Sequence, residues 1–131
     1  MLRKALIVED DPHTRRLLGR LIEAEDCKVD EAADGAKAIE MLSKVDYDLV
    51  LLDIVLPKLS GTAVMDHLFE TNPAMLERVI VVTGLNVEDI RKLFPTVCHA
   101  LSKPVIPNRL MDSVHKCLEA RFATPSQSHI A

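Results

Sequence analysis

Aromatic residues are scarce in this chain, which has no tryptophan, one tyrosine and three phenylalanines among its 131 residues. Hydrophobic residues nevertheless make up 48% of the sequence, so the core must be built mainly from valine, isoleucine, leucine and alanine. A chain of this length forms one domain, since domains typically hold about 100–150 residues. This composition favours strands and helices packed in layers around a single core.

Long apolar runs and an excess of positive charge are also absent. No stretch approaches the roughly 18 apolar residues of a membrane-spanning helix, and the first residues lead into a strand-like run rather than a secretory signal. The formal net charge is −4 at pH 7, which provides no basic surface for a polyanion. We therefore expect a cytoplasmic protein that neither enters a membrane nor binds nucleic acid directly.

Cysteine is rare, and its pattern argues against a disulfide framework. Cys27, Cys98 and Cys117 are odd in number and form no C-x-x-C pair. We expect three reduced cysteines that fill small apolar spaces, in a reducing compartment. The five histidines show no spacing suited to zinc, so we expect structural or surface roles for them.

Short unbroken apolar runs predict the strands of a parallel sheet. Residues 5–8, 49–52 and 79–82 form such runs, each bounded by polar residues. Strands that are buried on both faces have this pattern, so these three should lie at the centre of the sheet. Residues 28–33 and 97–102 are interrupted by charged residues or a histidine and fit strands nearer its edges.

Helical periodicity separates these runs. Asp11-Pro12 is typical of an N-cap followed by proline in the first turn, which predicts a helix over residues 12–25. Apolar residues that recur every three or four positions predict four more helices. They are expected from Gly35, from Gly61 to Phe69, around residues 87–93, and from near Pro107 to Phe122.

Strand and helix alternate five times along the chain. Short right-handed crossovers then favour an α/β fold with a single doubly wound five-stranded parallel sheet of order 2-1-3-4-5, flanked by five helices. Residues 123–131 show no periodicity, so we expect a domain over residues 1–122 and a flexible C-terminal tail.

Acidic and polar residues collect where the predicted strands end. They are Glu9 and Asp10, Asp53, Thr83, and Lys103. The carboxyl ends of parallel strands meet at one edge of a sheet, where ligands bind. Gathered carboxylates repel one another unless a cation is bound, and oxygen ligands with few protein contributions favour Mg²⁺. Lys103 can pair with Asp53 and then with an oxygen of an incoming phosphoryl group.

These residues stand in a pattern that resembles the receiver domains of bacterial two-component response regulators. The elements that carry the resemblance are Val8-Glu9-Asp10-Asp11-Pro12, Asp53-Ile54-Val55-Leu56-Pro57 with Gly61 beyond, Thr83-Gly84 and Lys103-Pro104. The resemblance covers residues 2 to about 122. Four elements in order, each at the end of a predicted strand, make it specific.

The resemblance implies a role for each residue of the pattern. Asp53 would be the phosphoacceptor, and the implied ligands of Mg²⁺ are Glu9, Asp10, Asp53 and the backbone carbonyl of Val55. Lys103 and the hydroxyl of Thr83 would bond the phosphoryl oxygens, with Gly84 leaving room beside the threonine. The family commonly joins the lysine to the following proline by a cis bond, which is expected here between Lys103 and Pro104.

The function implied is that of a phosphorelay switch rather than an enzyme. Asp53 would accept a phosphoryl group from a sensor histidine kinase or a phosphotransfer protein, and the domain would catalyse only its own phosphorylation and dephosphorylation. No effector domain follows residue 122, so we expect output through a downstream protein target or through an effector domain of a longer chain. The domain would be a monomer or a weak phosphorylation-linked dimer.

Position 100 departs from the family pattern. Receivers commonly carry tyrosine or phenylalanine three residues before the lysine, whereas this chain has Ala100. Two hypotheses stay open: either Phe94 or His99 supplies the moving ring, or the backbone of residues 84–99 alone reads the phosphorylation.

Two other functions compete with the switch. One is a phosphorylation-independent interaction module of the same fold. Such a module would not need Glu9, Asp10 and Asp53 to gather at one edge, where their charges repel one another. The other is an aspartate-nucleophile phosphatase, whose class places D-x-D after the first strand, whereas Asp53 follows the third. Asp11 also has a purely local explanation, as the N-cap of the first helix.

Overall fold

The computed structural model describes residues 3–122 and shows one five-stranded parallel sheet in the order β2-β1-β3-β4-β5. The strands are β1 (Arg3–Val8), β2 (Cys27–Ala32), β3 (Leu49–Leu52), β4 (Val79–Thr83) and β5 (His99–Ser102). The helices are α1 (Pro12–Glu23), α2 (Gly35–Lys44), α3 (Gly61–Thr71), the 3₁₀ helix η1 (Pro73–Arg78), α4 (Val87–Leu93) and α5 (Pro107–Phe122). The expected tail, residues 123–131, lies outside the described residues.

The predicted fold class and strand order are confirmed. The two interrupted segments, β2 and β5, form the edges of the sheet, as their mixed composition indicated. The prediction of five helices missed η1. No helix was expected between Phe69 and residue 79, but proline fits the first turn of a helix, and η1 begins at Pro73.

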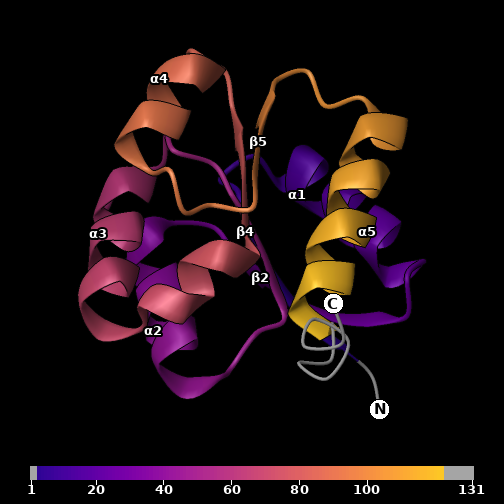
Figure 1. The fold of residues 1–131 in the computed structure, drawn as a ribbon, viewed down its shortest axis with the longest axis horizontal. Helices are drawn as coiled ribbons and strands as arrows, with labels where there is room; N and C mark the ends of the chain where they lie inside the picture. The colour runs from indigo at the N-terminus through magenta and orange to yellow at the C-terminus, as the bar shows by residue number, and fades with distance from the viewer. Residues whose placement is uncertain (1–2, 123–131) are drawn as a thin grey trace, which may run out of the picture.

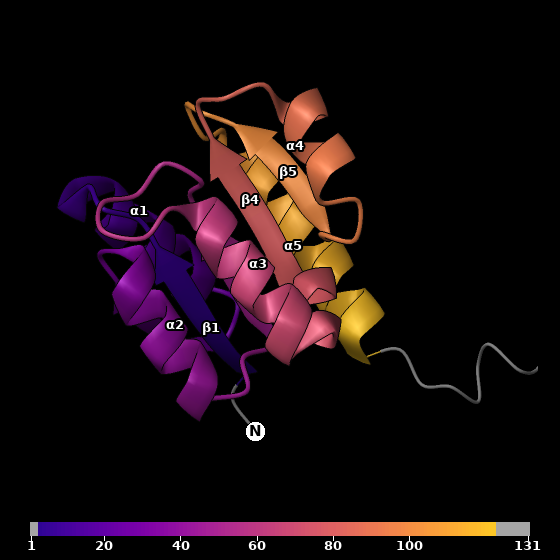
Figure 2. The same ribbon diagram turned by 90° about the vertical axis from the view of Figure 1, so that its left-hand side faces the viewer.

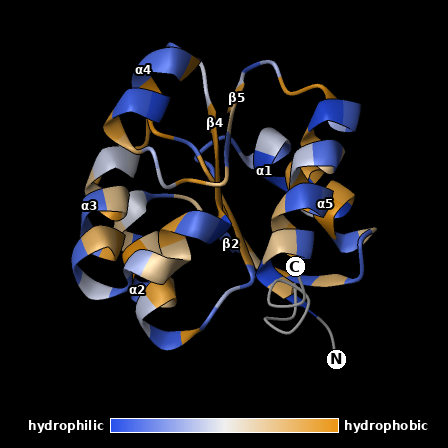
Figure 3. Ribbon diagram, viewed as in Figure 1, coloured by the Kyte–Doolittle hydropathy of each residue, from blue (hydrophilic) through white to orange (hydrophobic). Residues whose placement is uncertain are grey.

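Helices cover both faces of the sheet. Figure 1 shows α2, α3 and α4 on one side and α1 and α5 on the other, and Figure 2 shows the first group in front of the strands. All residues of β3 and β4 are buried, which explains their unbroken apolar sequences. In Figure 3 the hydrophobic colours lie on the strands and on the helix faces turned toward them. Within residues 3–122 no helix is long and apolar enough to cross a membrane.

Side-chain caps set where the helices begin. Asp11 accepts a hydrogen bond from the backbone N–H of Thr14 at 2.9 Å, and Asp34 accepts one from Lys37 at 2.8 Å. The interpretation of Asp11 as the N-cap of α1 is therefore confirmed. Hydrogen bonds from the hydroxyl and then the backbone N–H of Thr14 lower the pKa of Asp11, because the charged carboxylate is the better acceptor. The N–H of Lys37 lowers the pKa of Asp34 in the same way.

The expectation of three reduced cysteines is wrong for two of them. Cys98 and Cys117 form a disulfide, with Cα atoms 6.1 Å apart. The expectation failed because an odd number of cysteines still allows one pair. The 19-residue separation of Cys98 and Cys117 also does not show that α5 packs against the start of β5, which brings the two residues together. Cys27 is free and buried, and it fills a small apolar space as predicted.

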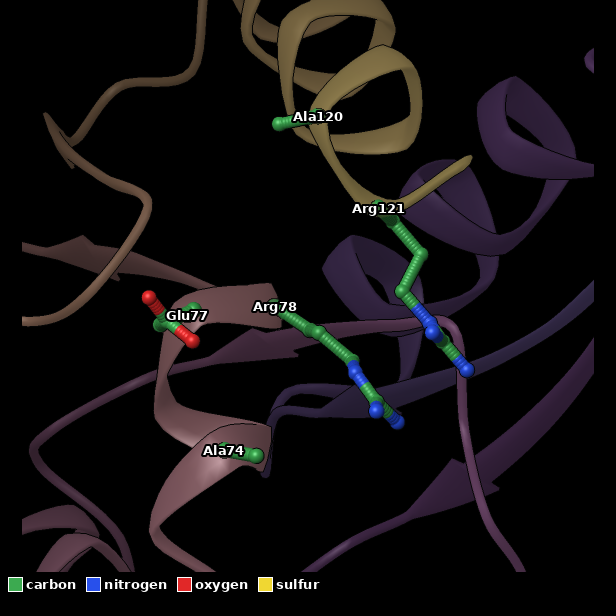
Figure 4. Close-up of a pocket in the computed structure, with 5 residues that line it drawn as sticks. All are labelled: Ala74, Glu77, Arg78, Ala120 and Arg121. Carbon is green, nitrogen blue, oxygen red and sulfur yellow. The ribbon is translucent and has the colours of Figure 1, made fainter. Parts of the chain in front are cut away.

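Two arginines hold η1 and the end of α5 at the amino ends of the strands. They line a pocket with Ala74, Glu77 and Ala120, and Figure 4 shows the side chains of Arg78 and Arg121 extending in the same direction. Arg78 lies 2.8 Å from Asp46, and Nε of Arg121 lies 3.6 Å from an oxygen of Asp48. Because acids of the α2–β3 connection already pair with these charges, the pocket has a structural explanation.

Candidate functional site

Backbone hydrogen bonds align the strand ends that carry the candidate residues. The N–H of Asp53 donates to the carbonyl of Val8 at 3.0 Å, which joins the ends of β3 and β1. The N–H of Lys103 donates to the carbonyl of Thr83 at 2.8 Å, which joins the ends of β5 and β4. The predicted site residues therefore meet at the carboxyl edge of the sheet.

Three carboxylates gather at this edge. One oxygen from each of Glu9, Asp10 and Asp53 lies within 4.8 Å of the others. Glu9 is 2% exposed and Asp53 is 6% exposed, whereas Asp10 faces solvent. The structure thus brings together the acids that the sequence placed on two separate strands.

A single ammonium group bridges the two buried acids. Nζ of Lys103 lies 2.8 Å from Oδ2 of Asp53 and 2.6 Å from Oε1 of Glu9. The pairing with Asp53 was predicted. The pairing with Glu9 was missed, although the placement of both residues at strand ends could have indicated it.

The bridge shifts the titration of its members. Burial raises the pKa of Glu9, because a charged carboxylate loses hydration, and the hydrogen bond from Lys103 only partly opposes this. Burial alone would lower the pKa of Lys103, but its hydrogen bonds to Asp53 and Glu9 outweigh burial and raise it. Lys103 is therefore held in its charged form beside the carboxylates.

Backbone N–H groups orient the carboxylates further. The N–H of Val55 donates to Oδ1 of Asp53 at 3.0 Å, and the N–H of Asp10 donates to Oε2 of Glu9 at 3.0 Å. Both carboxylates are thus held by donors at each oxygen. Within residues 3–122 the side chain of Asp10 has no such hydrogen bond, which leaves its oxygens open to a ligand.

Thr83 and its neighbours complete the edge. Thr83 is fully buried, and its hydroxyl oxygen accepts a hydrogen bond from the N–H of Leu85 at 3.1 Å. The expected cis bond between Lys103 and Pro104 is present. A Cβ at Gly84 would meet no atom within 4 Å, so the space beside Thr83 does not depend on a glycine there.

Gly61 allows α3 to pack directly under the phosphoacceptor candidate. Its N–H donates to the carbonyl of Ile54 at 2.8 Å. A Cβ on Gly61 would lie 2.4 Å from the backbone oxygen of Asp53, a distance that requires the backbone to shift. The glycine in the motif is therefore explained by close backbone approach.

Gly61→Ala is expected to lower the free energy of unfolding by about 2–3 kcal/mol, because the added methyl overlaps backbone that cannot rotate away. Urea denaturation measures the change. Gly19→Ala is the matched control: its Cβ would lie 3.6 Å from Val29, an ordinary contact, and it should stabilise α1 by about 0.5–1 kcal/mol. Equal stability of the two variants would contradict this explanation.

The donor set fits a hard divalent cation. All the gathered ligand atoms are carboxylate oxygens, which suit Mg²⁺. Three carboxylates against the one ammonium of Lys103 leave two negative charges uncompensated. A dication would neutralise this excess.

Comparison with known proteins agrees with this geometry. The family described as the response regulator receiver domain matches residues 5–115. The chain belongs to this family. This receiver domain is 30% identical over 122 residues to the chemotaxis protein CheY of Halobacterium salinarum, a match that covers 92% of the chain and 100% of the relative.

Larger relatives match over part of their length. The receiver domain is 39% identical over 87 residues to a cyclic di-GMP phosphodiesterase of Thermotoga maritima, covering 66% of this chain and 23% of that protein. It is 30% identical over 129 residues to the CpxR homolog of Haemophilus influenzae, a transcriptional regulatory protein, covering 97% of this chain and 55% of that one. The chain thus spans only part of these two relatives.

Solved structures share the fold. A CheY-like receiver domain from Methanospirillum hungatei superposes with a TM-score of 0.82 at 27% identity, covering 92% of this chain and 97% of that one. The response regulator TrrA of Thermotoga maritima, in complex with Mg²⁺-BeF, gives a TM-score of 0.78 at 25% identity over 89% of this chain and 100% of that one. The protein is a receiver domain of the two-component signalling type.

Proposed function

We propose that this receiver domain takes a phosphoryl group onto Asp53 in a Mg²⁺-dependent reaction and thereby switches its binding to a partner protein. The observation that carries the proposal is the position of the Asp53 carboxylate, which is buried beside Glu9 and Asp10 and paired with Lys103. This arrangement supports phosphoryl transfer, because the ammonium of Lys103 and a cation held by the carboxylates would stabilise the negative charge that develops on the phosphoryl oxygens. The Asp53 carboxylate is already charged, so it needs no protein base to remove a proton.

The residues that would hold Mg²⁺ are Glu9, Asp10, Asp53 and the backbone carbonyl of Val55. The excess negative charge of the cluster supports this assignment, and the related TrrA has been crystallised with Mg²⁺-BeF. When bound, the ion would neutralise developing charge and orient the phosphoryl group. Asp10 supplies the most accessible oxygens, since its side chain faces solvent at the rim.

The transfer step is a displacement at phosphorus. An oxygen of Asp53 forms the new P–O bond while the bond from phosphorus to the donor breaks, and its electron pair leaves with the donor. The donor atom is an imidazole nitrogen in a phosphohistidine or an acyl oxygen in a small acyl phosphate. Lys103 then meets the negative charge that spreads over the phosphoryl oxygens, because its Nζ already lies 2.8 Å from Asp53.

Thr83 would transmit the change. Its hydroxyl hydrogen can donate to a phosphoryl oxygen on Asp53, and a movement of the side chain would alter its hydrogen bond with the N–H of Leu85. That bond holds the connection between β4 and α4. Phe94 and His99 line a pocket with Ala100, which supports the hypothesis that one of these rings moves on phosphorylation. The alternative, a readout through the backbone of residues 84–99 alone, stays open.

We infer the donor to be a sensor histidine kinase or a phosphotransfer protein in the cytoplasm, where ATP can supply the phosphoryl group. Output would pass to a downstream protein or to an effector domain of a longer chain, from a monomer or a weak phosphorylation-linked dimer. The domain would catalyse only its own aspartyl phosphorylation and dephosphorylation.

Incubation with acetyl phosphate and Mg²⁺ should raise the intact mass of the protein by one phosphoryl group. Removal of Mg²⁺ by a chelator should abolish the gain, because the acidic cluster would then repel the anionic donor. Mass spectrometry of both samples makes the measurement. No gain with Mg²⁺ would support an interaction module instead, and release of many phosphates per protein would support a phosphatase.

A further inference from the structure

The disulfide joins the start of β5 to the interior of α5. Cys98 directly precedes β5, and its N–H donates to the carbonyl of Val79 at 2.9 Å, which fixes it beside β4. Cys117 lies on α5 and packs in the core between that helix and the sheet. The bond therefore closes a loop that contains β5, Lys103 and more than half of α5.

The two sulfurs differ in access. Cys98 is half-buried and lines a surface pocket with Arg91, Phe94 and His99, whereas Cys117 is 2% exposed. A reagent that enters from solvent therefore meets Cys98 first. This asymmetry is the arrangement of an attacked sulfur with a resolving sulfur behind it.

Positive charge acts on His99, the residue that follows Cys98. Burial, together with the charges of Lys116 and Arg91, lowers the pKa of His99, which neighbours Cys98 in the chain. Arg91 lines the same pocket as Cys98, and Lys116 neighbours Cys117. The half-buried sulfur of Cys98 therefore lies in a pocket that also carries the guanidinium of Arg91.

We propose that Cys98 and Cys117 form a reversible thiol–disulfide site that locks β5 to α5 when oxidised and releases them when reduced. The chemical partners are a dithiol reductant and a peroxide oxidant. The pair is a single disulfide beside the free Cys27. Single disulfides of this kind, where they occur in cytosolic proteins, are usually transient and catalytic or redox-sensing. The site goes beyond the phosphoacceptor function and does not depend on it.

Reduction proceeds by exchange at the accessible sulfur. A thiolate of the dithiol attacks Sγ of Cys98, the S–S bond breaks, and Sγ of Cys117 leaves with the electron pair and takes a proton. The second thiolate of the reductant then attacks the mixed disulfide and releases Cys98. Two electrons and two protons pass from the dithiol to the pair.

Oxidation reverses the state by a different route. The Cys98 thiolate attacks an oxygen of hydrogen peroxide, which gives a sulfenic acid and, after protonation, one water. The Cys117 thiolate attacks that sulfur and displaces hydroxide, which leaves as a second water. Two thiols and one peroxide thus yield the disulfide and two waters.

The test titrates the unmutated protein through a series of buffers of reduced and oxidised dithiothreitol without Mg²⁺ or phosphoryl donor, so that phosphorylation plays no part. Free thiols are trapped with a maleimide and counted by intact mass. We expect two thiols to appear together in one transition and the melting temperature to fall by roughly 10 °C on reduction. Amide hydrogen exchange in residues 99–117 should accelerate tenfold or more on reduction, because the lock is released.

Cysteine variants separate the pair from general thiol effects. Cys98→Ala should melt at one temperature in both redox states, whereas Cys27→Ala should keep the full shift. Two thiols that stay free under excess peroxide would overturn the proposal, as would a bond that resists excess dithiol in the folded protein. Because Cys98, His99 and Cys117 also lie close enough to hold a metal, zinc that binds the reduced protein and blocks oxidation would overturn it too.

Discussion

The Asp53→Asn variant should take up no phosphoryl group from acetyl phosphate and Mg²⁺ under conditions that modify the unmutated protein fully. An amide oxygen carries no negative charge and is a poor nucleophile, so the displacement at phosphorus loses its attacking group. Asp53 is 6% exposed, so its carboxylate is held in place in the unmutated protein. The neighbouring Glu9 should not take over as the attacking group in the variant, because Lys103 and the N–H of Asp10 already bind its two oxygens. Intact mass over time measures uptake.

Asp11→Asn is the matched control for that loss. Asp11 lies in the same acidic run, but its carboxylate caps α1, and asparagine caps a helix about as well as aspartate. Uptake by this variant should equal that of the unmutated protein. Peptide mapping that locates the phosphoryl group on any residue other than Asp53 would refute the assignment, and so would a full mass gain in Asp53→Asn.

Lys103→Met should slow phosphoryl uptake by roughly 10²–10³-fold, which is the usual cost of removing one positioned donor from a developing charge. The ammonium contacts both Asp53 and Glu9, at 2.8 and 2.6 Å, so no other side chain of the described residues offers the same contact. Methionine keeps most of the side-chain length without the charge. The rate of mass gain at fixed donor concentration measures the effect.

The same variant should also change how stability depends on pH. Burial raises the pKa of Glu9 above its ordinary value of 4.5, and Lys103 supplies the main opposing interaction. Without Lys103 the folded state binds a proton more tightly than the unfolded state, so stability is lost as pH rises above 4.5 and through the raised pKa. Urea denaturation in a chelator at several pH values should show this slope to be steeper than in the unmutated protein.

Lys58→Met is the control for both measurements. Lys58 follows Asp53 by five residues in the chain, but it is exposed and pairs with Asp34 at 3.4 Å rather than with the acidic cluster. It should leave the uptake rate and the pH slope unchanged. An equal loss of rate in the two lysine variants would mean that general surface charge, and not the bridge between Asp53 and Glu9, governs the reaction.

The sequence predicted most of the architecture because local chemistry repeats along the chain. Unbroken apolar runs located β3 with the same bounds as the structure, and mixed composition placed β2 and β5 at the edges. The predicted end of α1 at residue 25 was two residues late, since helix ends depend on caps and packing that periodicity does not show. The alternation of five strands with helices favoured the doubly wound order 2-1-3-4-5, which the structure confirms.

The candidate site was predictable to the extent that it lies at strand ends. Parallel strands bring their carboxyl ends to one edge, so Asp10 and Asp53 had to lie near each other once the fold was known. The partners of individual atoms were not predictable. Lys103 was expected to face Asp53, but its equally short bond to Glu9 depends on side-chain positions that no spacing encodes.

The sequence by itself determined the fold class, the order of the strands and the set of residues at the carboxyl edge, because these follow from periodicity and from the geometry of parallel sheets. Only the tertiary structure decided which distant atoms touch. One example is the Cys98–Cys117 bond. Another is the backbone of Leu59, which approaches Gly35 so closely that a Cβ there would lie 1.9 Å from its carbonyl oxygen. Such contacts depend on how a helix or loop packs onto its neighbour, and a shift of a few ångströms that no local pattern records would remove them.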